Sequence, residues 1–203
     1  MTDPAGEPEP AAPADYRLLL PDGWFRILLE PVERERSATA LVERQFQGVD
    51  NAPHLKAELL KDLLRRGAKA YRSGGIELYL SLQPVGPFTI PASLLVTLAP
   101  LEHPEPLPLD VLAGTLVGGA PAGQEVSIED LSSGPAVRVR KQTEQPGDDA
   151  DGRTHYSTSV EYHLPVPHTT AFLLLTFSTP LEPLADAMAG LFDAVADSLC
   201  WME

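Results

Sequence analysis

Three titratable side chains fall at odd-numbered positions of one predicted β-strand. They are His155, Glu161 and His163, and alternate residues of a strand point to the same face of a sheet. Imidazole and carboxylate groups are usual protein ligands of a catalytic zinc ion, so these residues are the candidate metal ligands. With a bound ion they would suit a metal-dependent hydrolase. The alternative interpretation is the solvated side of an edge hairpin, paired across the strands with Arg138 and Arg140.

Other catalytic patterns are absent from the sequence. It contains no G-x-x-x-x-G-K-[ST] phosphate loop, no G-x-G-x-x-G dinucleotide motif and no G-x-S-x-G nucleophile elbow. Its single cysteine, Cys200, excludes an internal disulfide and a cysteine-based zinc site. We expect Cys200 on the last turn of a C-terminal helix. We therefore assign no catalytic residue, no cofactor-binding residue and no cofactor, and we expect a protein that is not an enzyme.

The charge balance bears on the partners of the chain. It carries 15 Lys and Arg against 29 Asp and Glu, a net charge of −14. Nucleic acids and anionic membranes bind clustered basic residues, so neither is an expected partner. The acidic excess fits solubility or a basic protein partner. Because no apolar run of membrane-spanning length and no secretory leader is found, we expect a cytoplasmic protein, and the Ala-, Pro- and Arg-rich composition is typical of high-GC bacteria.

The first residues differ in composition from the rest of the chain. Residues 1–14 are rich in proline and acidic side chains and carry no bulky apolar residue apart from Met1. Such a segment buries too little apolar surface to offset the entropy of ordering it, so we predict a disordered tail. The remainder, 15–203, has the length of a single domain with a sizeable core.

Apolar patterning predicts an α+β fold with a mostly antiparallel sheet of about 7–8 strands packed by helices. Successive strands are joined by turn residues, which favours hairpins, the first of them a tight one around Pro21-Asp22-Gly23. Two consecutive amphipathic helices are predicted at 33–73 and a short helix at 109–116. The predicted strands are 16–20, 24–29, 76–83, 93–98, 124–131, 136–142, 155–164 and 171–178.

The closing segment has the clearest pattern in the chain. An apolar run at 171–178 predicts a buried strand, and Thr179-Pro180 ends it. The apolar stripe that follows predicts a long C-terminal helix lying against the sheet, in an α/β/α-type layered sandwich. The outer face of this helix is small and acidic, and a partner that docks there should be basic. The stripe is Leu181, Leu184, Ala185, Met188, Phe192, Val195 and Leu199, and the outer face is Asp186, Gly190, Asp193 and Asp197.

Both ends of the predicted domain resemble the Mog1/PsbP-like superfamily. The turn Pro21-Asp22-Gly23-Trp24 is similar to the proline, glycine and tryptophan opening of those domains, and the strand and helix from Phe172 to Trp201 are similar to their end. In element order the resemblance covers most of residues 16–203. It implies an antiparallel sheet between helical layers and a non-enzymatic binding or assembly role, and it transfers no partner and no site residue.

Three functional hypotheses follow. The first is a non-catalytic, cytoplasmic protein-binding or assembly module, such as an adaptor or a chaperone-like protein, and the broad apolar stripe at 55–71 makes a homodimer possible. The second is a small apolar-ligand binder of helix-grip type, in which the C-terminal helix closes a pocket over the sheet. The third is the metal-dependent hydrolase. The tyrosines that would line the pocket of the second are Tyr71, Tyr79, Tyr156 and Tyr162.

Overall fold

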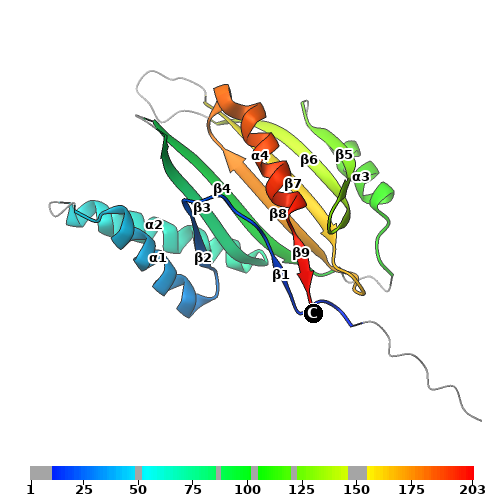
Figure 1. Cartoon of the computed structure of the whole chain (residues 1–203), viewed down its shortest axis with the longest axis horizontal. Coiled ribbons are helices and arrows are strands. Elements are labelled where there is room, and N and C mark those ends of the chain that lie inside the picture. The colour runs from blue at the N-terminus through cyan, green and yellow to red at the C-terminus, as the bar shows by residue number, and fades with distance from the viewer. Residues whose placement is uncertain (1–10, 49–51, 86–87, 102–104, 120–122, 146–154) are drawn as a thin grey trace, which may run out of the picture.

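The computed structural model describes residues 11–48, 52–85, 88–101, 105–119, 123–145 and 155–203. Its main sheet is antiparallel and has seven strands in the order β2-β3-β4-β8-β7-β6-β5 (Figure 1). The predicted α+β fold with a mostly antiparallel sheet and a C-terminal helix is confirmed. The strands are β2 (Trp24–Leu28), β3 (Gly75–Val85), β4 (Phe88–Ala99), β5 (Glu125–Leu131), β6 (Gly134–Gln145), β7 (His155–Pro165) and β8 (Phe172–Thr179).

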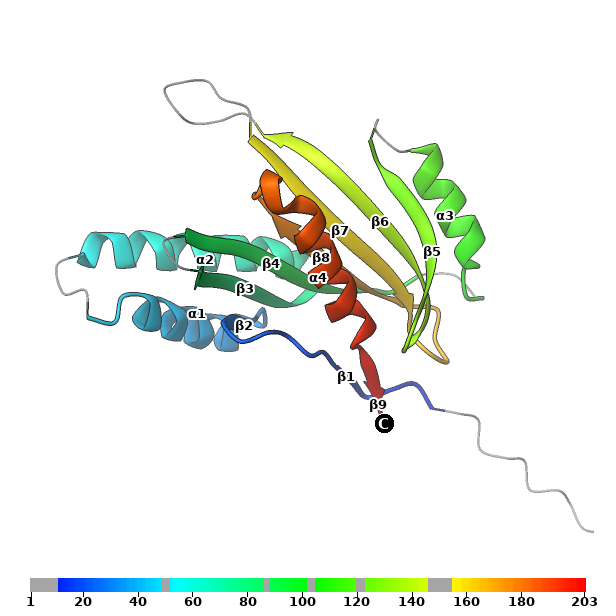
Figure 2. The ribbon, with the colours of Figure 1, turned by 45° about the horizontal axis from the view of Figure 1, so that its top comes forward.

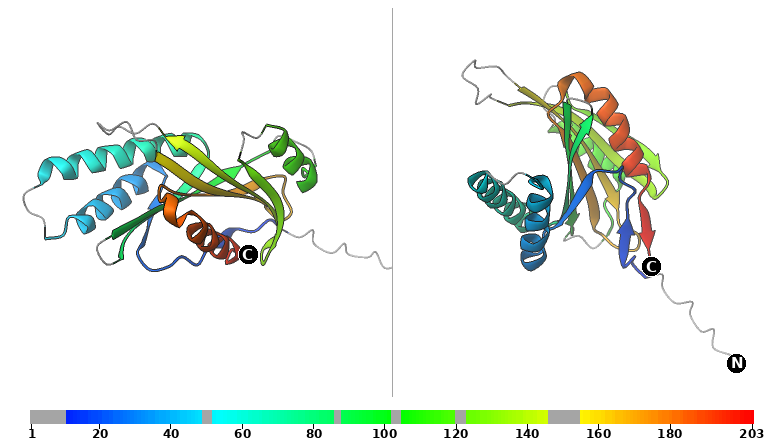
Figure 3. Two further views of the ribbon diagram at one scale, coloured as in Figure 1. Left: turned by 90° about the horizontal axis from the view of Figure 1, so that it is seen from above. Right: turned by 60° about the vertical axis from the view of Figure 1, so that its left-hand side comes forward.

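Helices lie on both sides of this curved sheet (Figure 3). α4 (Ala185–Asp197), preceded by the short 3₁₀ turn η1 (Glu182–Leu184), lies alone on the inner side. α1 (Pro31–Gln45) and α2 (Pro53–Arg72) cover the outer side at the β2–β3 end, and α3 (Leu109–Gly118) lies beside β5 and β6 at the other end. None of the helices in the described part of the chain is long and apolar enough to cross a membrane.

The inner side of the sheet holds the larger apolar core. Phe192 of α4 stacks on Phe177 of β8 with ring centroids 4.9 Å apart, and Tyr162 of β7 meets Phe177 edge-on at 6.5 Å. Five members of the predicted stripe are buried, whereas Leu184 is exposed. Burying such a stripe is the main source of stability for a surface helix. The buried members are Ala185, Met188, Phe192, Val195 and Leu199.

The C-terminal helix is shorter than predicted. It ends at Asp197, where the hydroxyl of Ser198 donates a hydrogen bond to the carbonyl oxygen of Val195 at 2.6 Å. The chain then forms a strand, β9 (Cys200–Met202), so the prediction that places Cys200 on a helical turn is wrong. The reason is non-local: β9 pairs with β1 (Asp15–Arg17), and the sequence near Cys200 gives no sign of this partner.

The predicted hairpin around Asp22-Gly23 is also wrong. Gly23 does take the positive φ of 88° that such a turn favours, but β1 does not pair with β2. Tyr16 lies opposite Trp201 of β9 instead, and the amide of Leu19 donates a hydrogen bond to Ser198 Oγ at 2.9 Å. The N-terminal strand therefore runs beside the C-terminus and forms a separate two-stranded sheet (Figure 1).

The predicted tail, 1–14, lies mostly outside the described residues. Residues 11–14 are described, and the amide of Ala14 donates a hydrogen bond to the carbonyl oxygen of Met202 at 2.9 Å. Ala14, which the prediction places in the tail, is thus bonded to the C-terminal strand.

A second apolar core lies under α1 and α2, on the outer side of the sheet. Its buried members are Ile27, Leu29, Ala38, Leu41, Val42 and Leu63.

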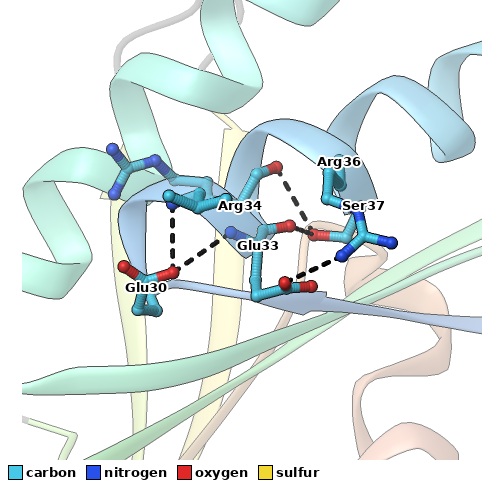
Figure 4. Close-up of polar contacts among 6 residues, drawn as sticks. Glu30, Glu33, Arg34, Arg36 and Ser37 are labelled. Carbon is cyan, nitrogen blue, oxygen red and sulfur yellow. Dashed lines mark hydrogen bonds and ion pairs between the residues drawn. The ribbon is translucent and has the colours of Figure 1, made fainter.

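The N-terminus of α1 is capped by Glu30, whose Oε2 accepts hydrogen bonds from the amides of Val32 at 3.0 Å and Glu33 at 3.2 Å (Figure 4). A negative side chain there also suits the positive end of the helix dipole.

Gly67 allows α1 and α2 to approach each other closely. A Cβ at this position of α2 would lie 2.7 Å from Cδ of Arg34 in α1. The side chain of Arg34 donates a hydrogen bond to the carbonyl oxygen of Leu29 at 2.9 Å, so it is held at the point of contact. A larger residue at 67 would have to displace it.

Strand β3 makes packing contacts on both faces, although its sequence alternates like a half-exposed strand. Leu78 and Leu80 pack against the α1–α2 core, as expected. On the other face Glu77 is only 6% exposed. Its carboxylate accepts hydrogen bonds from the hydroxyls of Tyr16 at 2.8 Å and Tyr79 at 2.6 Å, and it pairs with Arg26. These partners explain how a charged residue can be buried there.

Candidate functional site

A network of polar side chains joins α4 to β6 on the inner side of the sheet. The Nε of Arg138 donates to Asp193 Oδ1 at 3.0 Å, and a terminal nitrogen of the same guanidinium donates to Oδ2 at 3.2 Å. This two-pronged geometry is the strong form of an Arg–carboxylate pair. Strand register places Arg138 opposite Tyr162 of β7, and the tyrosine hydroxyl donates to Asp193 Oδ1 at 2.6 Å. The three side chains form one network between sheet and helix.

The surroundings of this network raise the pKa values of Tyr162 and Arg138, its two residues on the sheet. Burial raises the pKa of the Tyr162 hydroxyl, and the neighbouring Asp193 carboxylate raises it further. For Arg138, burial acts to lower the pKa, but the hydrogen bond to Asp193 outweighs it and the pKa is raised. Tyr162 therefore stays protonated and Arg138 stays charged at neutral pH, so the network has a fixed set of donors and acceptors.

Two further acids of the C-terminal helix also bond to the sheet side. Asp186 pairs with Arg140 of β6, and Asp197 Oδ1 accepts hydrogen bonds from the amide of Ser132 at 2.8 Å and its hydroxyl at 3.1 Å. The three acids of the predicted outer face thus all bond to the sheet side, although Asp186 and Asp197 remain exposed. Arg138 and Arg140 alternate on one strand, and acids seven residues apart share one helix face, so the charges meet across the layers.

A cleft of about 630 Å³ opens beside this network, between α4 and strand β5. Four acidic residues and one arginine line the cleft, so it carries an excess of negative charge. The hydroxyl of Ser127 donates a hydrogen bond to Glu129 at 2.6 Å, and Asp130 is exposed. The lining residues are Glu129, Asp130, Leu131, Arg138, Tyr162, Asp193, Ala194 and Asp197.

Two of the predicted metal ligands, Glu161 and His163, lie together on the opposite side of the sheet. His163 Nε2 is 2.7 Å from Glu161 Oε1, and the hydroxyl of Thr176 donates to Glu161 Oε2 at 3.3 Å. The close contact with His163 lowers the pKa of the Glu161 carboxyl below its ordinary value, although burial opposes this, and Lys141 lowers it further.

The interpretation that pairs these residues with Arg138 and Arg140 is wrong. Glu161 lies opposite Val139 and His163 lies opposite Val137, so the arginines point to the other side of the sheet. Nor is the hairpin at an edge, because β7 lies between β6 and β8. Parity within one strand predicts which side chains share a face, but the register that fixes their cross-strand neighbours depends on the turn between the strands.

His155 does not join the pair. It is the first residue of β7, opposite Gln145 of β6, and it lies six positions before Glu161, about 20 Å at the usual rise. Within the ranges that the structure describes, no three His, Cys, Asp or Glu residues lie close enough to hold one metal ion. Glu161 and His163 alone supply fewer than the three protein ligands usual in a catalytic zinc site.

The four tyrosines of the helix-grip hypothesis do not converge on one pocket. Tyr162 belongs to the network with Asp193, and Tyr79 bonds to Glu77. Tyr71 of α2 and Tyr156 of β7 are exposed. Between α4 and the sheet, the stacked rings of Phe177 and Phe192 occupy the space in which such a ligand would lie.

Sequence reasoning named only Asp193 and Asp197 of the acidic cleft as a face for a basic partner and did not connect them with β5 or with Arg138. Glu129 and Asp130 read as ordinary charges on a strand next to a turn. The signal that could have found the cleft was the complementarity between the two strand arginines, Arg138 and Arg140, and the helix acids. That signal requires knowing that α4 lies beside β6, and helix patterning does not determine this.

Comparison with known proteins adds a relationship of fold. No family model and no curated protein matches the chain. The chain is similar to the solution structure of cyanobacterial PsbP (CyanoP) from Synechocystis sp. PCC 6803, at 12% sequence identity and a TM-score of 0.35. The alignment covers 92% of this chain and 86% of that chain. This is a weak PsbP-like likeness of fold, and it assigns no site and no partner.

Proposed function

We propose that this chain is a non-catalytic binding module whose acidic cleft receives a basic segment of a partner protein. The observation that carries the proposal is the cleft between α4 and β5, which four acidic residues and one arginine line. The net charge of −14 adds a long-range field that attracts cationic partners. We place this binding in the cytoplasm as part of the proposal.

The carboxylates of the cleft differ in how much binding capacity they retain. Asp193 is engaged by Arg138 and Tyr162, and Asp197 by Ser132. Glu129 and Asp130 lie on β5, which is the last strand of the sheet at this end. A carboxylate has about four lone-pair positions, so Glu129 keeps acceptor capacity beyond its bond to Ser127. These two side chains are the ones we expect to meet Lys or Arg of the partner.

A second copy of the chain is the other candidate partner for a module of this kind. Two large apolar side chains of α2, Leu55 and Tyr71, are exposed. Measurement of the mass in solution by light scattering distinguishes a homodimer from a monomer whose partner is a different protein.

The test uses a fluorescein-labelled oligolysine peptide and fluorescence anisotropy. The variant Glu129→Gln/Asp130→Asn removes two charges from the cleft, and Glu35→Gln/Glu43→Gln removes two charges from exposed positions of α1 as the matched control. If each cleft carboxylate contributes about 0.5–1 kcal/mol, the cleft variant binds about 5–30-fold more weakly than the wild type. The control binds like the wild type. Equal weakening in both variants would show unspecific charge attraction and contradict the proposal.

A further inference from the structure

An apolar pocket of about 290 Å³ lies where the two ends of the described chain meet, and it shares no residue with the acidic cleft. One wall is the N-terminal segment that leads into β1, and another is Trp201 of β9. The remainder comes from the β3–β4 end of the sheet and from the connection between β7 and β8. Its main apolar lining residues are Pro13, Ile76, Leu98, Val166, Leu173 and Trp201.

Backbone and side-chain hydrogen bonds hold these walls in place. Tyr16 and Trp201 are paired in the small sheet, and the amide of Ala14 donates to the carbonyl oxygen of Met202 at 2.9 Å. The indole Nε1 of Trp201 donates to the carbonyl oxygen of Ser133 at 3.3 Å, which fixes the ring. The pocket is thus a built feature of the fold, and a ligand would not have to order its walls.

The polar groups of the lining already have partners. The hydroxyl of Tyr16 donates to Glu77 at 2.8 Å, and the hydroxyl of Thr169 donates to the carbonyl oxygen of Val166 at 2.9 Å. Neither Lys, Arg nor His occurs among the lining residues, and the one charged lining residue is Asp15. An anionic ligand would meet no cation there and would be repelled by Asp15.

The apolar lining is incompletely covered. Leu98 is 42% exposed and Ile76 is 36% exposed, so a ligand that covers them removes apolar surface from water, which is favourable in proportion to the area. An apolar cavity of about 150 Å³ holds one benzene ring, so this pocket has room for about two rings or a hydrocarbon of similar size.

We infer that this pocket binds an uncharged, apolar small molecule of about the size of two aromatic rings. The apolar-ligand function expected beneath the C-terminal helix is thereby placed under the N-terminal strand instead, where β1 pairs with β9. This site is independent of the proposed binding of a basic segment.

The test uses naphthalene and naphthalene-1-sulfonate, two probes of nearly equal shape that differ in charge, with binding followed by saturation-transfer NMR titration. The wild type binds naphthalene, and naphthalene-1-sulfonate binds at least about tenfold more weakly. Leu98→Glu places a charge in the pocket and weakens naphthalene binding by about tenfold or more. The matched control Leu55→Glu changes a leucine of similar exposure on α2, 47% against 42%, and leaves binding unchanged.

A second variant keeps the test decisive if Leu98→Glu does not fold. Ala171→Leu adds volume to the pocket wall without adding charge, and it too weakens naphthalene binding. Three outcomes each overturn the inference: absence of naphthalene binding to the wild type, equal affinity for the two probes, or unchanged binding in folded Leu98→Glu and Ala171→Leu proteins.

Discussion

At the scale of single residues, the charge of Glu161 is set by its neighbours more than by its burial. Its side chain is mostly covered by the sheet around it, and burial alone disfavours a carboxylate. The imidazole of His163 at 2.7 Å, together with Lys141 and the hydroxyl of Thr176, outweighs that effect and lowers the pKa of the carboxyl. Glu161 is therefore an anion held by a partner on the sheet surface.

This arrangement predicts a pH dependence of stability. Because the folded pKa of Glu161 lies below its unfolded value of about 4.3, its stabilising contribution is complete above that pH and is lost as the pH falls through the lower, folded pKa. We expect Glu161→Gln to reduce the fall in the free energy of unfolding between about pH 5 and pH 3, measured by urea denaturation. The variant Glu125→Gln on the exposed edge strand serves as control and keeps the wild-type profile. A wild-type profile in Glu161→Gln would mean that the pair does not stabilise the charge.

At the scale of elements, local patterns correctly predicted which face of a helix is buried. They failed where an element forms only by pairing with a distant part of the chain. The spacing of Met188, Phe192 and Val195 predicted the buried face of α4 because a helix repeats every 3.6 residues. The end of the helix at Asp197 was missed because β9 exists only through pairing with β1. The bonds from the acids of α4 to Arg138 and Arg140 were also missed, since nothing local shows that α4 lies beside β6.

Breaking the two ion pairs between α4 and β6 should lower the free energy of unfolding by unequal amounts. The guanidinium of Arg138 is 14% exposed and the carboxylate of Asp186 is 90% exposed. Asp193→Asn leaves Arg138 partly buried without its counter-charge and should lower the free energy of unfolding by about 1–3 kcal/mol. Asp186→Asn removes a solvent-screened pair on the same helix and should cost less than about 0.5 kcal/mol. Urea denaturation at pH 7 measures both free energies of unfolding. Equal decreases in the two variants would contradict the prediction that the Arg138–Asp193 pair stabilises the fold more than the Arg140–Asp186 pair does.

At the scale of the whole molecule, one curved sheet separates two apolar cores, and the chain ends meet beyond it. Alternation and turn signals predicted the sheet and its helical layers because these are repeated, local features. The meeting of β1 with β9 could not be predicted, since it joins Asp15–Arg17 to Cys200–Met202 across nearly the whole sequence. The acidic cleft and the apolar pocket each combine segments distant in sequence, so neither had a local signature.

Because β1 pairs with β9, we expect an N-terminal deletion to lower stability only when it includes β1. Deleting residues 1–10 should leave the melting temperature unchanged, because their composition cannot support a packed segment. Deleting residues 1–17 also removes β1 and the hydrogen bond from Tyr16 to buried Glu77, and should lower the melting temperature by about 4–10 °C. Tyr16→Phe in the full chain loses that hydrogen bond but keeps the strand. Its melting temperature should lie between those of the two deletion variants. Differential scanning calorimetry measures all three, and a 1–17 deletion that melts like the wild type would show that the union of the two chain ends contributes nothing to the stability of the sheet.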